Sequence, residues 1–517
     1  MKLTGQFFKN KNNKTSNSFN EIVENSETDR ELSSNVKSNE DALNEIFSSS
    51  IDFTVNEIIM AGKKGLVVYL NSMVNAERVY EEVKGTVIQL SSKEDISFSH
   101  IQKSYFTDQK SFFVKTYHEC VWNILNGAVI VFLDSYKEAL AIEVNGFETR
   151  SITEPSTQTV IRGPKDGFVE SIQTNISLIR RRIKNPRLVF EQFIVGSESR
   201  TAVVIASVKG IMNEETLKEI KTRIEQSDVP AILDSGNIEE LISDNIYTPF
   251  PLIFNSERPD TIAANLMEGK AAILVDGSPF VLLAPCVFSD FFQTAEDYYQ
   301  PFFMASFLRI IRYISFMIAL IMPSLYVAIT TYHVGLLPTP LLISIQSQRE
   351  GVPFPAVIEI LIMEFAFEVL REAGVRMPRV VGQTVSIVGA LVIGQAAVEA
   401  GIVSNVLVII VAFTAISSFV TPIYKFSIAT RILRFVLILG ASAMGLYAIL
   451  LLLVIMVAHL SGLKSFGIPY LTPIAPLSPD NQDDVFIRFP IGANKKRPTY
   501  LKPKMENNMA KQGGNKK

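Results

Sequence analysis

The sequence predicts a mixed α/β cytoplasmic region of the α+β type, followed by an all-α polytopic membrane domain. The chain has 517 residues and is 48% hydrophobic, and its apolar residues are concentrated after Tyr313, which is typical of a membrane region. Before that point, short β-rich runs alternate with amphipathic helical patterns, which favours a mixed α/β fold. Residues 1–25 are rich in Lys, Asn and Ser and lack an apolar signal segment, so we expect the front region to stay in the cytoplasm.

Composition and residue spacing argue against several functional classes. The net charge of −3 leaves no basic surplus to neutralise phosphates, so we predict no nucleic-acid partner. The chain has two cysteines, Cys120 and Cys286, too few for a disulfide framework or a cysteine-built metal site. No phosphate-binding glycine loop is recognisable, and the four histidines lack ligand or catalytic spacing: His100, His118, His333 and His459. We therefore predict no enzymatic activity, no catalytic residue, no cofactor and no metal.

The first domain is expected to follow a disordered polar tail. Residues 1–50 are dominated by Asn, Ser, Lys and Glu, with too few large apolar side chains to offset the entropy of ordering. A first α/β subdomain is expected over residues 51–150, with a helix over residues 52–65 and a strand over residues 65–73. Residues 127–144 contain two apolar runs around a polar turn, which predicts a β-hairpin.

A second α/β subdomain is expected over residues 151–300. It should begin with a helix over residues 168–183, which ends in the basic triplet Arg180, Arg181 and Arg182. The triplet fits either a helix end at a solvated surface or a patch for anionic lipid or an acidic partner. The remaining predicted elements are a helix over residues 213–226 and strands over residues 188–195, 202–208 and 271–275.

The transmembrane domain is expected over residues 301–462, with four or five spans. Spans are predicted over residues 313–332, 402–420 and 435–459, whereas residues 334–345 are short and interrupted by prolines and fit a re-entrant or interfacial segment. Basic residues beside the spans favour a cytoplasmic start by the positive-inside rule. The last span would then place the polar tail, residues 463–517, outside, although its lysines prefer the cytoplasmic side.

The predicted helix over residues 355–373 is too acidic for a lipid-facing span. In a membrane, the carboxylates of Glu359, Glu364 and Glu368 would cost up to about 8–10 kcal/mol on an insertion scale, whereas the apolar residues return about 3–5 kcal/mol. Two interpretations are open: an acidic vestibule at a cation pathway, or a solvated face with local ion pairs to Arg371 and Arg376. The carboxylates concerned are Glu359, Glu364, Glu368 and Glu372.

The next predicted helix, over residues 380–398, contains a narrow stripe of small and polar residues. Such a stripe permits close helix packing, but it can also line a water-filled path. Two glutamine side chains favour the path, because an amide that faces lipid would be unsatisfied. The candidate pore-lining residues are Gln383, Ser386, Ala390, Gly394, Gln395 and Ala397.

Longer motifs in the chain resemble the A subunit of the GerA family of spore germination proteins. The resemblance is carried by EPSTQTVIRGPKDGFVESIQTNISLIRRRIKNPRL from Glu154, by VDGSPFVLLAPCVFSDFFQTAEDYYQPF from Val275, and by REGVPFPAVIEILIMEFAFEVLREAGVRMP from Arg349, followed by GQTVSIVGALVIGQAAVEAGIVS. It implies an integral protein of the spore inner membrane, with its large N-terminal region on the spore core side. It also implies a receptor that detects nutrient germinants together with a transporter-like B subunit and a lipoprotein C subunit.

The resemblance further implies a homo-oligomer, in contact with membrane lipid, that acts as a ligand-gated cation channel. Two alternatives stay open: a non-conducting scaffold or signalling subunit, and a sporulation paralogue that works without dedicated partners. A secondary transporter is less favoured, because no internal repeat pairs two broken helices.

Overall fold

The computed structural model describes residues 30–48, 50–75, 78–91, 97–106, 111–144, 154–376, 394–490, 492–493 and 496–505. The chain divides into two compact units, which we name the sheet unit and the helical unit. The sheet unit comprises Met1–Ser243, Ile253–Pro285 and Pro490–Lys517, and the helical unit comprises Asp244–Leu252 and Cys286–Phe489.

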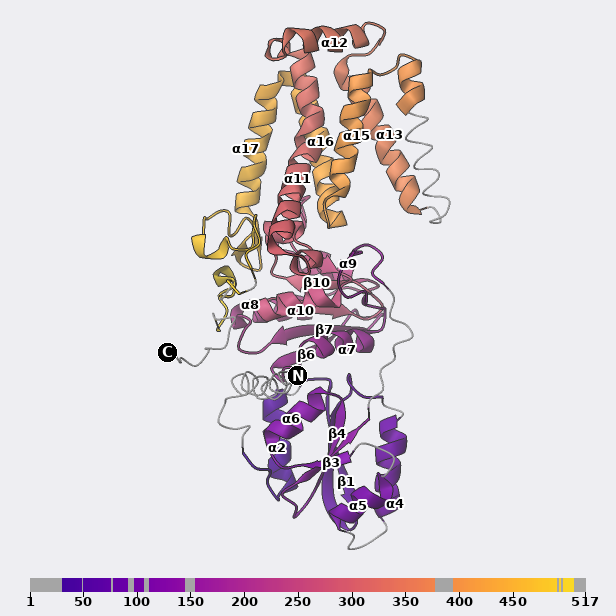
Figure 1. Ribbon diagram of the computed structural model, residues 1–517, viewed down its shortest axis with the longest axis vertical. Helices are drawn as coiled ribbons and strands as arrows, with labels where there is room; N and C mark the ends of the chain where they lie inside the picture. The colour runs from indigo at the N-terminus through magenta and orange to yellow at the C-terminus, as the bar shows by residue number, and fades with distance from the viewer. Residues whose placement is uncertain are drawn as a thin grey trace, which may run out of the picture. The chain divides into compact units, whose positions relative to one another are not determined.

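The sheet unit contains two five-stranded antiparallel sheets with the same topology (Figure 1). The first sheet has the order β1-β2-β4-β5-β3 and the second has the order β6-β7-β9-β10-β8, so the five strands of each sheet follow one scheme. The strands are β1 (Phe53–Met60), β2 (Lys63–Leu70), β3 (Ser111–Val114), β4 (Ala128–Leu133), β5 (Ala139–Glu143), β6 (Leu188–Val195), β7 (Thr201–Val208), β8 (Phe254–Ser256), β9 (Ala271–Val275) and β10 (Val281–Ala284).

The helices of the sheet unit repeat in the same way. One helix precedes the first strand of each sheet, helical segments connect its second and third strands, and one helix connects its third and fourth strands. The sheet unit is therefore a structural duplication. In the first half the segments are α2 (Val36–Phe47), η1 (Val79–Lys84), α4 (Gly85–Ser91), α5 (Phe98–Tyr105) and α6 (Tyr117–Leu125); in the second they are α7 (Ile172–Arg182), α8 (Glu214–Glu225), α9 (Ser235–Ile242) and α10 (Pro259–Glu268).

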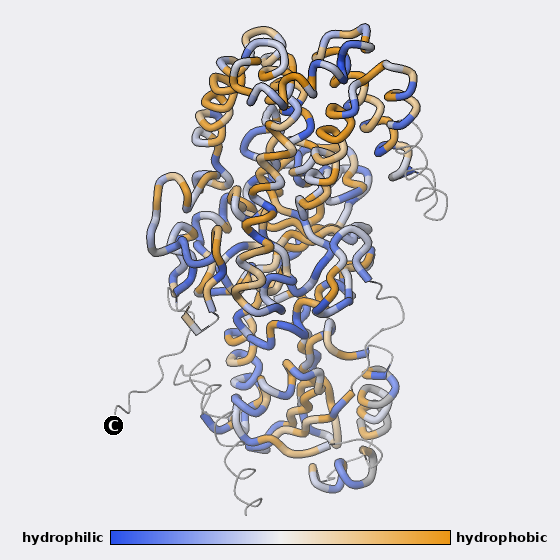
Figure 2. The backbone as a smooth tube through the Cα atoms, turned by 45° about the horizontal axis from the view of Figure 1, so that its top comes forward, coloured by the Kyte–Doolittle hydropathy of each residue, from blue (hydrophilic) through white to orange (hydrophobic). Residues whose placement is uncertain are grey.

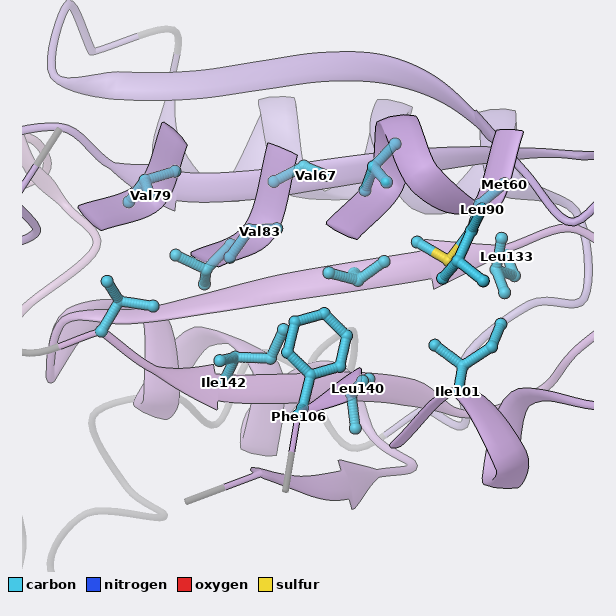
Figure 3. Packing of buried hydrophobic residues seen from close by; sticks show 14 of the residues in the cluster. Met60, Val67, Val79, Val83, Leu90, Ile101, Phe106, Leu133, Leu140 and Ile142 are labelled. Carbon is cyan, nitrogen blue, oxygen red and sulfur yellow. The ribbon is translucent and has the colours of Figure 1, made fainter. Parts of the chain in front are cut away.

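The central strand β4 shows how the first sheet is built. All six of its residues are buried, because helices cover both faces. Val129 and Val131 belong to one apolar cluster, whereas Ile130 and Phe132 belong to the cluster on the other face, as the two-residue strand period requires. Figure 3 shows the first cluster, in which strands and helical segments contribute Val67, Val83, Phe106 and Ile142 among others.

Two sequence predictions in the first half are wrong. Residues 30–48 are not part of a disordered tail: α2 is capped by Asn35 and buries Leu43 and Phe47 against the first sheet. The predicted helix over residues 52–65 is a strand, β1, joined to β2 by a tight turn at Ala61 and Gly62. Both turn residues have positive φ, the geometry of a two-residue hairpin, and this outweighs the weak helical periodicity.

Other predictions in the sheet unit are confirmed. The hairpin predicted over residues 127–144 is the antiparallel pair β4–β5. The strands predicted over residues 188–195, 202–208 and 271–275 are β6, β7 and β9, and the predicted helices over residues 168–183 and 213–226 are α7 and α8, with slightly shorter limits.

Arg180 joins the two halves of the sheet unit. Its side chain is fully buried, with Nε 3.0 Å from Oδ2 and Nη2 2.8 Å from Oδ1 of Asp52, which lies just before β1. The hydroxyls of Ser50 and Ser72 also donate to this carboxylate, and Nη1 of Arg180 donates to the Leu188 carbonyl at 2.9 Å. Neither interpretation of the basic triplet holds for Arg180, which forms a buried bidentate ion pair.

Within the described residues, six longer helices form most of the helical unit (Figure 1). Two of them, α11 and α16, are long and apolar enough to cross a membrane, and α15 and α17 are shorter apolar helices. Hydrophobic residues predominate along these helices (Figure 2). The six helices are α11 (Phe302–Thr331), α12 (Thr339–Arg349), α13 (Ala356–Arg376), α15 (Asn405–Phe419), α16 (Tyr424–Met444) and α17 (Leu446–Gly462).

The predicted span over residues 435–459 is wrong, because the chain forms two helices there. The first, α16, ends at Gly445, which has φ 61° and ψ −138°, and α17 follows. A Cβ at Gly445 would lie 2.7 Å from His333 Cε1, so the turn needs glycine for both its conformation and its close contact. An average of hydropathy along the chain does not detect such a break.

Two further boundaries differ from the predictions. The helix at the first predicted span, α11, begins at Phe302 rather than Tyr313, so Arg309 and Arg312 lie within it. The polar tail predicted after Gly462 is partly folded, with a short β-hairpin at residues 464–469 and a fully buried Tyr470.

Candidate functional site

The four carboxylates of α13 lie in different surroundings. Glu359 and Glu364 are almost completely buried, with 0% and 1% of their surface exposed. Glu368 is partly buried and Glu372 is exposed. Because buried carboxylates need compensating partners, the contacts of Glu359 and Glu364 determine what this helix can do.

Glu364 forms an ion pair with Arg434 of α16. Nη1 of Arg434 lies 2.7 Å from Oε2 of Glu364, and its Nε donates to the Ala319 carbonyl of α11 at 2.7 Å. Oε1 of Glu364, Nη2 of Arg434 and Oγ1 of Thr414 on α15 are buried and have no hydrogen-bond partner among the described residues. Residues of α13, α16 and α11 therefore form an ion pair whose hydrogen-bonding groups are only partly satisfied.

Glu368 extends this ion pairing along α13. Its Oε2 accepts from Nη1 of Arg431 at 2.6 Å, and its Oε1 lies 3.7 Å from Nη1 of Arg371. Arg371 also donates to the Ser418 hydroxyl at 2.7 Å, while its guanidinium lies over the ring of Phe419. The Nε atoms of Arg371 and Arg431 are buried and unpaired within the described part of the chain. We name Glu364, Glu368, Arg371, Arg431 and Arg434 the α13–α16 seam.

Glu359 lies at the start of α13 and contacts two other segments. Its Oε1 accepts from Nη2 of Arg349 at 3.1 Å, at the end of α12. Its Oε2 accepts from the backbone N–H of Ser404 at 3.2 Å, and Ser404 is the N-cap residue of α15. A carboxylate at this position is stabilised both by the arginine and by the positive end of the α15 dipole.

The seam is costly for a set of apolar helices. A buried ion pair offsets its desolvation only when the remaining donors and acceptors are also satisfied. Here they are not, so simple packing is a poor explanation of the charges. One oxygen of Glu364 can still accept a hydrogen bond, and the seam arginines each have an unused donor. The carboxylate can therefore change its arginine partner without leaving a charge unpaired.

The local ion pairs expected from the spacing are present. Glu368 pairs with Arg371 at 3.7 Å, and Glu372 pairs with Arg376 at 2.7 Å. The partners of Glu359 and Glu364 were missed, because they are not on the same helix. One signal pointed to Arg434: it lies within the apolar run RILRFVLILGA, where an unpaired guanidinium would be costly.

Only part of the predicted pore-lining stripe lies within the described residues. Gln383, Ser386 and Ala390 are outside them. Gly394 is buried, and a Cβ there would lie 3.6 Å from Cγ1 of Val408, which suits close helix packing. Gln395 is exposed, and its Nε2 donates to Oε1 of Glu399 at 2.9 Å. Ala397 is partly buried, and the role of the stripe stays a prediction.

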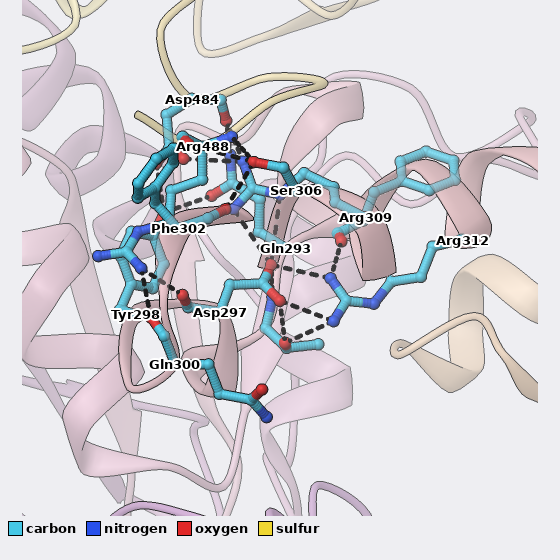
Figure 4. Close-up of polar contacts among 12 residues, drawn as sticks. Gln293, Asp297, Tyr298, Gln300, Phe302, Ser306, Arg309, Arg312, Asp484 and Arg488 are labelled. Atoms are coloured by element: carbon cyan, nitrogen blue, oxygen red, sulfur yellow. Dashed lines mark hydrogen bonds and ion pairs between the residues drawn. The ribbon is translucent and has the colours of Figure 1, made fainter. Parts of the chain in front are cut away.

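A second ion-pair network surrounds the start of α11 (Figure 4). We name Asp297, Arg309, Arg312, Asp484 and Arg488 the α11 junction. Asp297 accepts from Nη2 of Arg309 at 3.1 Å and from Nη2 of Arg312 at 2.7 Å. Oδ1 of Asp484 accepts from Arg309 at 2.8 Å, and Nη1 of Arg488 donates to the Asp297 carbonyl at 2.8 Å.

The junction has two consequences for the helical unit. It places residues 484–488, which follow α17, beside the start of α11, so both ends of the helix bundle lie together. It also pairs Arg309 and Arg312 with carboxylates, so these arginines are weaker signals of membrane orientation than the sequence indicated. Burial alone would raise the pKa of the Asp297 carboxyl, but the hydrogen bond and charge of Arg312, with the charge of Arg309, outweigh it and lower that pKa.

Fold and site together define a two-part protein, in which duplicated antiparallel α/β sheets precede a helical region with an ionised interior. No group of three or more His, Cys, Asp or Glu residues in the described ranges could hold a metal ion. The chain belongs to the GerA family: residues 41–500 match the model of the Bacillus/Clostridium GerA spore germination protein. The resemblance seen in the sequence is thereby confirmed.

Curated relatives extend over most of the chain. Spore germination protein KA of Bacillus subtilis (strain 168) is 46% identical over 459 residues, covering 87% of this chain and 84% of the relative. Spore germination protein GerLA of Bacillus cereus is 42% identical over 466 residues, covering 88% of this chain and 93% of the relative. The uncharacterized membrane protein YfkQ of B. subtilis is 41% identical over 475 residues, covering 91% and 92%.

The comparisons with solved structures include a germinant-receptor domain. It is the N-terminal domain of the A subunit of the Bacillus megaterium spore germinant receptor GerK3, with a TM-score of 0.40 and 29% sequence identity. The match covers 50% of this chain and 98% of that chain.

Proposed function

We propose that the chain is the A subunit of a nutrient germinant receptor and that it oligomerises into a ligand-gated cation channel in the spore inner membrane. Family membership and the names of the relatives support the role in germination. The transporter-like B subunit and the lipoprotein C subunit are the proposed partners. In this proposal, the N-terminal region lies on the cytoplasmic, spore core side.

Exposed apolar surface supports a polytopic membrane domain. Soluble proteins rarely expose large contiguous apolar patches, whereas lipid-facing helices do. The short break at Gly445 adds one crossing to the predicted topology and returns the chain after α17 to the side where α11 begins. In the proposal, the lysine-rich tail then lies on the cytoplasmic side, as the positive-inside rule favours. Exposed apolar side chains include Phe303, Phe307, Ile310 and Ile314 on α11, and Leu450, Leu451, Val454 and Ile455 on α17.

The half-satisfied α13–α16 seam is the observation that carries the channel proposal. Charges are retained inside membrane helices chiefly where they serve ion pathways or switching. In the proposal, the helix that the sequence predicts over residues 380–398 lines the path with its polar stripe. Glu359, Glu364 and Glu368 of α13 flank the path, whereas the exposed Glu372 does not, and exchange of partners between Glu364 and the seam arginines accompanies opening. The domain boundaries at residues 150, 300 and 462 stay predictions.

Cation flux tests this function directly. Purified protein is reconstituted in liposomes, with its partner subunits and germinant where required, and monovalent cation release is measured. Gln395→Leu and Glu364→Gln should each change the flux at least tenfold, whereas the matched control Glu372→Gln, on the exposed part of α13, should not. Unchanged conductance and selectivity in both variants would exclude these positions from the path, and absence of flux in any oligomeric state would favour the scaffold alternative.

A further inference from the structure

One part of the α13–α16 seam carries an uncompensated positive charge. The seam contains three arginines and two glutamates, and Arg434 forms a close pair with Glu364 at 2.7 Å. The other two arginines share Glu368. Its Oε2 lies 2.6 Å from Nη1 of Arg431, and its Oε1 lies 3.7 Å from Nη1 of Arg371. One carboxylate cannot neutralise two guanidinium groups, so one positive charge remains at Glu368.

No other described carboxylate of these helices compensates this charge. The sequences of α15 and α16 contain no Asp or Glu. On α13, Glu372 is exposed and pairs with Arg376 at 2.7 Å, and Glu359 pairs with Arg349 at 3.1 Å. An uncompensated cation between apolar helices is costly, which favours an anionic ligand that the chain itself does not supply.

The two arginines still have hydrogen-bond donors to offer. Nη2 of Arg431 makes no hydrogen bond within the described residues, and Nη1 of Arg371 lies too far from Glu368 to form one. Each of these arginines also has an Nε atom without a partner in the same ranges. Neither side chain is completely enclosed, since 13% of the Arg431 side chain and 10% of the Arg371 side chain are exposed. Both arginines therefore reach the surface of the helices.

Exposed aromatic rings flank the two arginines. The guanidinium of Arg371 lies 4.7 Å from the ring centroid of Phe419, and that of Arg431 lies 5.7 Å from the ring centroid of Tyr424. Both rings are more than half exposed. Because Phe419 ends α15 and Tyr424 begins α16, the arginines lie near the ends of two apolar helices. Aromatic side chains at such helix ends are typical of the level of the lipid headgroups.

This end of α16 lies beside the start of α11. Phe426, in the first turn of α16, stacks on Phe291 with ring centroids 5.2 Å apart, and its ring centroid lies 5.5 Å from that of Phe288. Phe288 and Phe291 precede α11 in the chain. In the proposed function this side is cytoplasmic, and anionic lipids give the cytoplasmic leaflet of a membrane a negative surface potential.

We propose that Arg371 and Arg431 bind the phosphate group of an anionic phospholipid. The phosphate accepts hydrogen bonds from both guanidinium groups, whose planar donors suit phosphate oxygens, and it compensates the charge that Glu368 leaves. The exposed ring of Phe419 offers apolar surface to an acyl chain. The site rests on the membrane location in the proposed function, but it does not depend on ion conduction.

Lipid titration of the full-length protein in a neutral detergent tests this site. The thermal unfolding midpoint should rise on addition of phosphatidylglycerol, and much less on addition of phosphatidylcholine with the same acyl chains or of inorganic phosphate. Arg431→Gln should weaken the apparent affinity for phosphatidylglycerol at least tenfold. The matched control Arg376→Gln, which removes an exposed arginine of α13, should leave this affinity unchanged.

A charge change that keeps both arginines provides the second arm. Glu368→Gln removes the carboxylate that competes with the phosphate, so it should strengthen the affinity for phosphatidylglycerol at least fivefold. Glu372→Gln changes the net charge by the same amount at the exposed end of α13 and should have no such effect.

Two results would overturn the lipid site. One is an equal affinity of the wild type, Arg431→Gln and Glu368→Gln for phosphatidylglycerol, and the other is equal stabilisation of the wild type by inorganic phosphate or phosphatidylcholine. Normal lipid binding in a protein that conducts no cations would instead contradict the channel proposal and leave the site supported.

Discussion

Two buried ion-pair networks in the described part of the helical unit differ in how completely their atoms are hydrogen-bonded. In the α11 junction, no buried side-chain nitrogen or oxygen of the five named residues lacks a partner. In the α13–α16 seam, Glu364, Arg371, Arg431 and Arg434 each have one buried atom without a partner among the described residues. A completed network stabilises one arrangement, whereas an incomplete one leaves alternative pairings close in energy. We therefore infer that the junction holds the two ends of the helix bundle together, and that the seam exchanges its ion-pair partners when the protein switches.

Removal of the central carboxylate of the junction should have the largest effect on stability. Asp297→Ala leaves Arg309 and Arg312 buried without their shared partner, and loss of one member of a buried ion pair costs about 3–5 kcal/mol. We expect a large fall in the thermal unfolding midpoint of the detergent-solubilised protein, measured by a fluorescence melt. A midpoint within experimental error of the wild type would show that the junction does not hold α11 to residues 484–488.

Removal of one seam charge should cost less. Arg434→Met leaves Glu364 unpaired, but Arg371 and Arg431 have spare donors close to the same helix, so we expect a loss below about 3 kcal/mol. The same melt, run beside Asp297→Ala, measures the difference. A loss larger than that of Asp297→Ala would remove the distinction between the two networks.

Acid should remove the contribution of Asp297 to the junction. Because the folded state lowers the pKa of Asp297, its contribution to stability is complete above the unfolded pKa of about 3.9 and is lost as the pH falls through the folded value. We expect the unfolding midpoint of the wild type to fall below about pH 4. Asp297→Asn should show a smaller dependence on pH over this range, and an identical dependence would contradict the role of this carboxylate.

The smallest effect is expected at the exposed end of α13. The Glu372–Arg376 pair is solvent-exposed, and such i,i+4 pairs contribute about 0.3–0.5 kcal/mol. Glu372→Gln should therefore leave the unfolding midpoint almost unchanged. The shift should be even smaller at high salt, because salt screens the ion pair. A shift as large as that of Arg434→Met would place Glu372 in the seam.

Local patterns were sufficient for much of the sheet unit. The β4–β5 hairpin was predictable because two apolar runs flank a polar turn, and β9 was predictable because it is a short apolar run. The helix α2 was missed because its segment is mostly polar, and its few buried side chains are stabilised by a sheet formed later in the chain. The composition of a segment indicates the entropy lost when it becomes ordered, but it does not show which surface of the protein the segment packs against.

The candidate site was only half predictable for a similar reason. The spacing of Glu368 and Arg371 identified their ion pair, since both lie on one helix. Glu364 and Arg434 are 70 residues apart, and helix packing alone brings them together. The break at Gly445 was hidden because both flanking segments are equally apolar.

The double variant Glu364→Leu/Arg434→Met tests the central claim most directly, because it separates switching from stability. Replacement of both members of a buried ion pair by apolar residues is often neutral or stabilising. We predict that this variant folds with an unfolding midpoint at or above that of the wild type, while its cation flux in liposomes changes at least tenfold. A stable double variant with unchanged flux would contradict a functional role for the seam.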